Sequence, residues 1–172
     1  MRGLIIREAK LTDAKNIAKV HVKTWQQAYR RQIEDDFLNK LSVEKRTKAW
    51  EDNIANSKIN QKTFVAERNG KILGFVAVGP CRDKDAKKEW GELYAIYVDQ
   101  RYASKGIGTM LTQKGLDFLK EQGFKEVTLW VLTTNIKGRL FYESKGWKTE
   151  GKTKRGRIGR AQVKEIRYCV SL

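Results

Sequence analysis

The 172-residue sequence is poor in the residues that build metal centres and disulfide frameworks. It holds one histidine, one proline and two cysteines, Cys81 and Cys169, which stand far apart without a CxxC pair. A zinc site is therefore not expected, and we predict no metal. No stretch is long and apolar enough to span a membrane, and the N-terminus carries no signal-peptide pattern. These absences favour a cytoplasmic protein.

Charge is strongly one-sided, with 36 Lys and Arg against 20 Asp and Glu, a formal net charge of +16. Such an excess suits polyanionic partners, including nucleic acid and acidic proteins. The basic stretch 152–160 is the best candidate footprint for nucleic acid. The other interpretation is a lysine-rich, solvated surface, because the basic residues are dispersed along the chain.

Apolar residues make up 40% of the chain, and five Trp, six Tyr and six Phe supply material for a packed core. The length fits one ordinary domain, and we find no internal repeat, linker or low-complexity tract. We therefore expect a single domain over residues 1–172.

Hydrophobic periodicity predicts a mixed α/β domain in the order β-α-α-β-β-β-α-β-α-β-β. Asn69-Gly70 marks a tight hairpin turn within Lys62–Pro80, because this dipeptide readily takes positive φ. The other predicted strands are Leu4–Ala9, Trp90–Val98, Glu126–Leu132, a short strand around Trp147–Thr149, and Val163–Val170. The predicted helices are 11–30, Val43–Ile54, 105–123 and 135–146, and a basic turn is expected at 151–160.

The stretch "QRYASKGIGTML" joins the strand that ends at Val98 to the helix that follows it. The first turn of a helix offers free backbone N–H groups, and glycine lets a ligand approach them closely. The nearest acid after Gly106 is Asp117, so the helix start carries no negative charge of its own. Two interpretations are open: a seat for an external anion, or a plain glycine turn before a buried helix.

A second motif lies one strand further on, where Asn135–Trp147 reads N-x-x-G-x-x-F-Y-E-x-x-G-W. Together the two motifs resemble the GCN5-related N-acetyltransferase (GNAT) superfamily, and the resemblance covers the core from Phe64 to Trp147. It implies an α/β (α+β) fold: a mixed, mostly antiparallel sheet with a splayed central strand pair, flanked by about four helices. It also implies acetyl-CoA as co-substrate and a homodimer as one possible assembly.

The resemblance places the acetyl-CoA pyrophosphate on the loop residues Ser104, Lys105, Gly106, Ile107, Gly108 and Thr109. Backbone groups near Ile96 and Val98 are expected to hold the pantetheine arm, and Asn135 either bonds that arm, caps its helix or does both. The chain departs from the family pattern at Ala103, where Gln or Arg is usual, and at Ser104, where Gly is frequent. We expect weaker coenzyme binding as a result.

Tyr142 matches the tyrosine that protonates the departing thiolate, and the alternative is a packing residue beside the coenzyme sulfur. For the base we expect Glu92, which strict alternation places on one face with Tyr94, Ile96 and Val98, unless a bulge breaks the parity. Trp25 and Tyr29 either wall the acceptor pocket or belong to the core.

The resemblance thus implies an N-acetyltransferase that moves acetyl from acetyl-CoA to a primary amine by direct attack in a ternary complex. The acceptor is a small molecule or a protein amine. The alternative function is a GNAT-like binding or regulatory module whose basic surface binds nucleic acid or an acidic protein.

Overall fold

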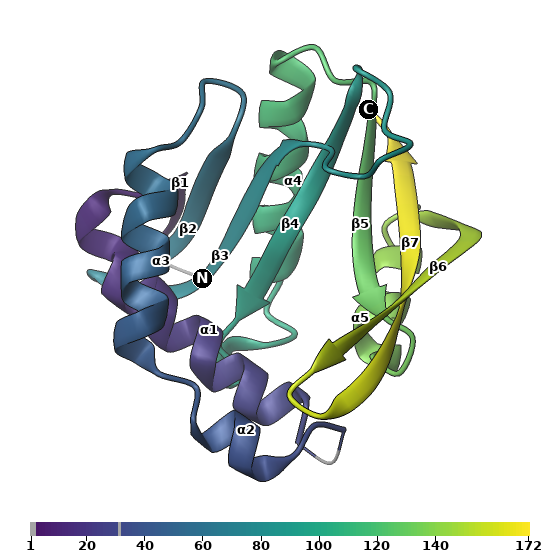
Figure 1. Cartoon of the computed structure of the whole chain (residues 1–172). Helices are drawn as coiled ribbons and strands as arrows, with labels where there is room; N and C mark the ends of the chain where they lie inside the picture. The colour runs from purple at the N-terminus through teal and green to yellow at the C-terminus, as the bar shows by residue number, and fades with distance from the viewer. Residues whose placement is uncertain (1–2, 31) are drawn as a thin grey trace.

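The computed structural model describes residues 3–30 and 32–172 (Figure 1). Its strands are β1 (Leu4–Glu8), β2 (Lys62–Arg68), β3 (Lys71–Pro80), β4 (Trp90–Val98), β5 (Glu126–Leu132), β6 (Lys148–Ile158) and β7 (Ala161–Ser171). Its helices are α1 (Ala14–Ala28), α2 (Asp35–Asn39), α3 (Val43–Ala55), α4 (Ile107–Glu121) and α5 (Ile136–Glu143). Two short 3₁₀ turns, η1 (Leu11–Asp13) and η2 (Gln100–Tyr102), precede α1 and α4.

The seven strands form one sheet in the order β1-β2-β3-β4-β5-β7-β6. All neighbours are antiparallel except β4 and β5, which pair in parallel only over Trp90–Glu92 and Glu126–Thr128. Beyond these residues the two strands diverge, as the widening gap between them in Figure 1 shows. The predicted fold class, with its splayed central strand pair, is confirmed.

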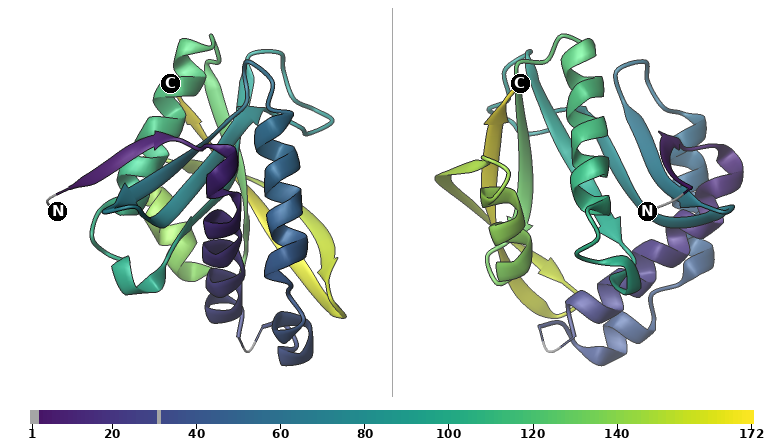
Figure 2. Two further views of the ribbon diagram at one scale, coloured as in Figure 1. Left: turned by 90° about the vertical axis from the view of Figure 1, so that its left-hand side faces the viewer. Right: turned by 180° about the vertical axis from the view of Figure 1, so that it is seen from behind.

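Helices cover both faces of the sheet (Figure 2). On one face α1 and α3 pack over β2 and β3 through Ile17, Trp50 and Phe75. On the other face α4 and α5 cover a larger apolar cluster that includes Leu111 and Tyr142. Strand β3 is buried on both faces, which explains why its sequence is a continuous apolar run.

A bulge in β4 reverses the expected alternation of its side chains. Ala77 faces Ala95, but the next residue of β3, Val78, faces Leu93, so Tyr94 is the extra residue. Its ring lies across Gly79, where an added Cβ would meet the Tyr94 hydroxyl at 2.5 Å. A bulge was the open alternative to strict alternation along β4, and it is present: Tyr94 packs toward α1 and α3, whereas Ile96 and Val98 pack toward α4.

Two segments differ from the sequence prediction. Helix α2 was not expected, and its Leu38 packs with Tyr29 and Ile33 at the end of α1. The stretch predicted as a basic turn is mostly strand: β6 continues to Ile158 and turns only at Gly159, which has a φ of 61°. Its ladder with β7 keeps this basic segment extended, although almost all of its side chains are exposed.

Candidate active site

A cavity of about 520 Å³ lies beside the part of β4 that has separated from β5. Its walls come from the end of α1, from β4, from the loop before α4, and from α5. Segments from four separate parts of the chain therefore meet at one hollow, where the sheet leaves backbone groups unpaired.

The loop before α4 presents its backbone to this cavity. Gly106 is the N-cap of α4 with a φ of 79°, and Ser104 also takes a left-handed conformation with a φ of 59°. No acid lies in the first turn of α4, so the partial positive charge of the helix start is uncompensated. Of the residues predicted to seat the pyrophosphate, Ser104, Gly106, Gly108 and Thr109 line the cavity.

The two other predicted loop residues lie outside the cavity lining. Ile107 is 1% exposed and anchors the first turn of α4 in the core. Lys105 is exposed, and its Nζ atom lies 5.5 Å from the centroid of the Tyr102 ring. The loop therefore offers backbone and hydroxyl groups on its inner side and a cation on its outer side.

Strand β4 forms a second wall through Ile96, Tyr97 and Val98. In the described ladder, the residues of β4 beyond Glu92 have no partner on β5. An extended ligand can pair with such an edge as an additional strand. The two residues predicted from the resemblance, Ile96 and Val98, both lie at this edge.

Helix α5 and the residues at its two ends contribute Asn135, Lys137, Gly138, Phe141, Tyr142, Ser144 and Lys145 to the cavity. The Asn135 side chain accepts a 3.0 Å hydrogen bond from the Gly138 backbone N–H, so it caps the helix. The Asn135 side chain lies so close to the backbone at position 138 that glycine is required there, because a Cβ at Gly138 would lie 2.7 Å from Asn135 Nδ2. The cap fixes the amide of Asn135 at the cavity wall.

Tyr142 is 8% exposed and lines the cavity from the last turn of α5. Its ring packs against Trp147 and Phe141, with centroids 5.8 and 5.4 Å away. Among the described residues, no hydrogen-bond partner is recorded for its hydroxyl. Burial raises the pKa of Tyr142 above its ordinary value, so the phenol stays protonated at neutral pH. Tyr142 is thus a protonated phenol at the cavity wall.

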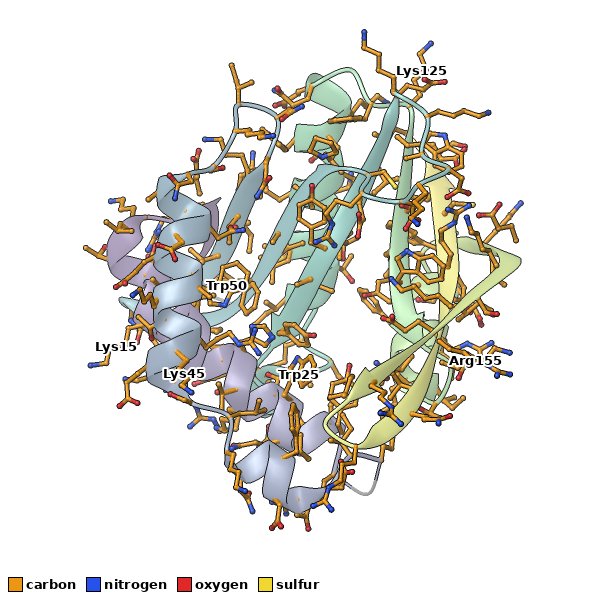
Figure 3. The ribbon with its side chains drawn as sticks, viewed as in Figure 1. Lys15, Trp25, Lys45, Trp50, Lys125 and Arg155 are labelled. Carbon is orange, nitrogen blue, oxygen red and sulfur yellow. The ribbon has the colours of Figure 1, made fainter. Side chains whose placement is uncertain are left out.

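The far end of the cavity is aromatic and belongs to α1 and β4. Tyr29 lines it and also packs in a buried apolar cluster, whereas Trp25 lies behind and donates a 2.8 Å hydrogen bond from Nε1 to the Tyr97 hydroxyl. Thr24 also lines this end, and its Oγ1 is buried with no hydrogen-bond partner in the described part of the chain. Figure 3 shows Trp25 at the end of α1, near the foot of the sheet.

Glu92, predicted as the base, lies outside the cavity lining. Its carboxylate accepts hydrogen bonds from the Arg82 guanidinium at 2.6 and 3.0 Å and from the Arg82 backbone N–H at 3.0 Å. Arg82 in turn stacks on the Tyr94 ring at 4.0 Å. The bulge thus places Glu92 on the sheet face of Tyr94 and Tyr97, opposite Ile96 and Val98.

A family model described as "Acetyltransferase (GNAT) family" matches residues 21–147. The chain belongs to this family. An uncharacterized N-acetyltransferase of Bacillus subtilis, YuaI, is 37% identical over 140 residues, which cover 81% of this chain and 77% of that protein. The GNAT assignment therefore rests on most of the chain, and it makes the protein an acetyltransferase.

Solved GNAT structures share the fold. The PaiA N-acetyltransferase of Thermoplasma acidophilum, in complex with coenzyme A, has a TM-score of 0.71 at 22% identity and covers 94% of this chain and 97% of its own. A ribosomal-protein-alanine N-acetyltransferase of Brucella melitensis has a TM-score of 0.76 at 20% identity, covering 98% and 99%. At these identities the likeness concerns the fold.

Sequence reasoning missed several cavity residues of this GNAT protein. Tyr97 escaped because strand alternation turns it away from Ile96 and Val98, although it lines the cavity with them. Lys137 and Lys145 lie on either side of the FYE motif, and their closeness to it in the sequence was the available signal. Among the described residues, no group of three His, Cys, Asp or Glu side chains is placed to hold a metal, and no helix is long and apolar enough to cross a membrane.

Proposed function

We propose that this GNAT protein transfers an acetyl group from acetyl-CoA to a primary amine, with both bound at once. The observation that carries the proposal is the single cavity that gathers the loop amides before α4, the unpaired edge of β4 and the Tyr142 hydroxyl. These groups fit the parts of acetyl-CoA in turn: an anionic pyrophosphate, an amide-bearing arm and a thioester.

Each group has a distinct role in the proposed transfer. The amides from Ser104 to Thr109 bind the pyrophosphate, and Lys137 and Lys145 add positive charge nearby. Backbone groups of β4 hold the arm and polarise the thioester carbonyl, an effect worth ~3–4 kcal/mol in comparable sites. A bond forms between the amine nitrogen and the acetyl carbon as the C–S bond breaks. Tyr142 gives its proton to the leaving sulfur.

Direct transfer is favoured over an acyl-enzyme because neither cysteine lines the cavity. The Cys81 thiol contacts the Thr128 hydroxyl, and the Cys169 thiol points to the Lys148 carbonyl. Burial raises the pKa of Cys169 above its ordinary value, which also makes it a poor nucleophile.

We propose that Tyr29 and Tyr97 form the acceptor end and that Glu92 takes up the amine proton through water. Glu92 shares the sheet face of Tyr97, and a bridging water would connect it to an amine beyond the cavity wall. Glu92→Gln and Arg82→Gln separate this role from a structural one, since both remove the ion pair. A base role predicts that kcat falls about 100-fold in Glu92→Gln only. Equal kcat in the two variants would make Glu92 a structural residue.

The central test measures free thiol released from acetyl-CoA in the presence of a panel of amines. Tyr142→Phe keeps the ring packing and removes the acid, so we expect kcat to fall about 100-fold or more while coenzyme affinity, measured by calorimetry, is kept. Tyr168→Phe is the matched control, because Tyr168 packs on Tyr142 but lies outside the cavity lining. Coenzyme binding without thiol release for any amine would contradict the transfer, and an unchanged Tyr142→Phe rate would remove Tyr142 from it.

A further inference from the structure

A second pocket lies on the other side of η2 from the coenzyme cavity. It measures about 370 Å³ and lies between α1, the β2–β3 turn and the segment after β4. Its charged lining residues are Lys19, Lys23, Lys71, Asp99 and Arg101. None of its lining residues is shared with the coenzyme cavity, although Tyr102, the last residue of η2, lines that cavity.

Positive charge is concentrated beside this pocket around one aromatic ring. The cationic groups of Arg68, Lys71, Arg101 and Lys105 all lie 5.4 to 5.9 Å from the centroid of Tyr102. A phenol face attracts a cation only weakly at an exposed site, and four cations around one ring repel one another. This arrangement is unfavourable unless an anion is added.

The one acid of the pocket is already engaged. Asp99 is 5% exposed; its carboxylate accepts from the Arg101 backbone N–H and guanidinium and lies 3.6 Å from Lys23 Nζ. Lys19 and Lys71 make no salt bridge within the described residues. Two cations of the pocket therefore have no protein counter-charge.

The cations suit phosphate more than carboxylate. Lys19 and Lys23 are four residues apart on α1, so their side chains leave the same helix face one turn from each other. Lysine binds phosphate as a point charge, whereas paired carboxylates favour the planar fork of arginine, and the one arginine of the pocket is already held by Asp99. Several separated charges around a small hollow match a ligand with more than one phosphate.

We propose that this pocket binds a small anion carrying two or more phosphate groups, at a site separate from the coenzyme seat. The site does not depend on the proposed transfer reaction. Arg101 and Asp99 fix η2, and Ala103 and Ser104, which follow it, line the coenzyme cavity. An anion held by Lys19 and Lys71 in this pocket thus lies beside the short turn that leads to the proposed coenzyme loop.

The test uses inorganic tripolyphosphate, titrated by calorimetry into the full chain with and without saturating coenzyme A. Lys19→Ala/Lys71→Ala removes the two free cations of the pocket. Lys120→Ala/Lys125→Ala is the matched control, because it removes the same charge from exposed positions at the other end of the sheet, where Figure 3 labels Lys125. Loss of charged hydrogen bonds predicts that the pocket variant raises the tripolyphosphate Kd about tenfold or more, and that the control leaves it unchanged.

One-to-one binding that persists with coenzyme A and weakens only in the pocket variant supports the proposal. Binding abolished by coenzyme A would assign tripolyphosphate to the coenzyme seat and overturn it. Equal weakening of tripolyphosphate binding in both variants would show a general charge effect and would overturn the proposal. Absence of tripolyphosphate binding to the unsubstituted protein would overturn it as well. Thiol release by the pocket variant, measured in parallel, reports on the transfer reaction independently.

Discussion

Replacing Ser104 by glycine tests whether the loop before α4 stores backbone strain. Ser104 has a φ of 59°, a left-handed conformation that L-residues adopt at a cost of roughly 1–2 kcal/mol. Its side chain is exposed, and no hydrogen bond from its hydroxyl is recorded among the described residues. Nothing in the described contacts therefore offsets the strain, and glycine removes it.

Glycine also gives the unfolded chain more conformational freedom, which lowers the free energy of unfolding by about 0.4–1 kcal/mol. This loss offsets part of the stability gained by relieving the strain. We therefore expect Ser104→Gly to raise the free energy of unfolding by about 0.5–1 kcal/mol. For a chain of this size that is a rise in Tm of about 1–4 °C.

Thermal and urea unfolding of the coenzyme-free protein measure this effect, and the neighbouring residue supplies the control. Ala103 has a φ of −60°, so Ala103→Gly relieves nothing and should destabilise by roughly 0.5–1 kcal/mol. Ser104→Ala keeps the strain and should change stability little. A loss of stability in Ser104→Gly, or a shift equal to that of Ala103→Gly, would refute the reasoning.

Two further predictions concern the buried His21 and the glycine beside the Asn135 helix cap. Burial lowers the pKa of His21 to about 3. The unfolded chain takes up this proton below about pH 6.5 and the folded chain does not, so the free energy of unfolding falls by about 1.4 kcal/mol per pH unit as pH drops from there toward 3. Urea unfolding measured across this pH range should show that the free energy of unfolding of His21→Gln does not fall in this way. An equal fall in the variant and in the unsubstituted protein would contradict the prediction. Gly138→Ala places a methyl group 2.7 Å from Asn135 Nδ2, so it should lower the free energy of unfolding by about 1 kcal/mol through loss of the cap and raise the KM for acetyl-CoA. Gly156→Ala is the control and should do neither, because its methyl group meets only Val163, at an ordinary contact distance of 3.8 Å.

The sequence is informative where burial imposes a pattern. Trp90–Val98 and Glu126–Leu132 have the predicted bounds, because each is an apolar run ended by polar residues. The Asn69-Gly70 turn takes positive φ at both residues, as its composition requires. The motif around Tyr142 located α5 and the cavity wall, since the spacing of those residues reflects a helix packed on the sheet.

The sequence is silent where pairing, not burial, decides the structure. Strand β6 has an almost wholly exposed, basic sequence, and only its ladder with β7 makes it a strand. The bulge at Tyr94 cannot be read from composition, and it moves Glu92 to the sheet face opposite Ile96 and Val98. Contacts between distant segments, such as those of Arg68 and Lys71 with the Tyr102 ring, also have no local signal.

The short β4–β5 ladder has a mechanical consequence. Three residue pairs join a half-sheet of β1–β4 to a half-sheet of β5–β7, so the backbone connection between the two half-sheets is short. Elsewhere the two half-sheets are held together by the core beneath α4 and by the contact of α2 with the β6–β7 hairpin. The cavity is lined by β4 of one half-sheet and by α5, whose Tyr142 packs on Tyr168 of β7 in the other half-sheet. We therefore expect a molecule seated in the cavity to restrain movement of the two half-sheets relative to each other.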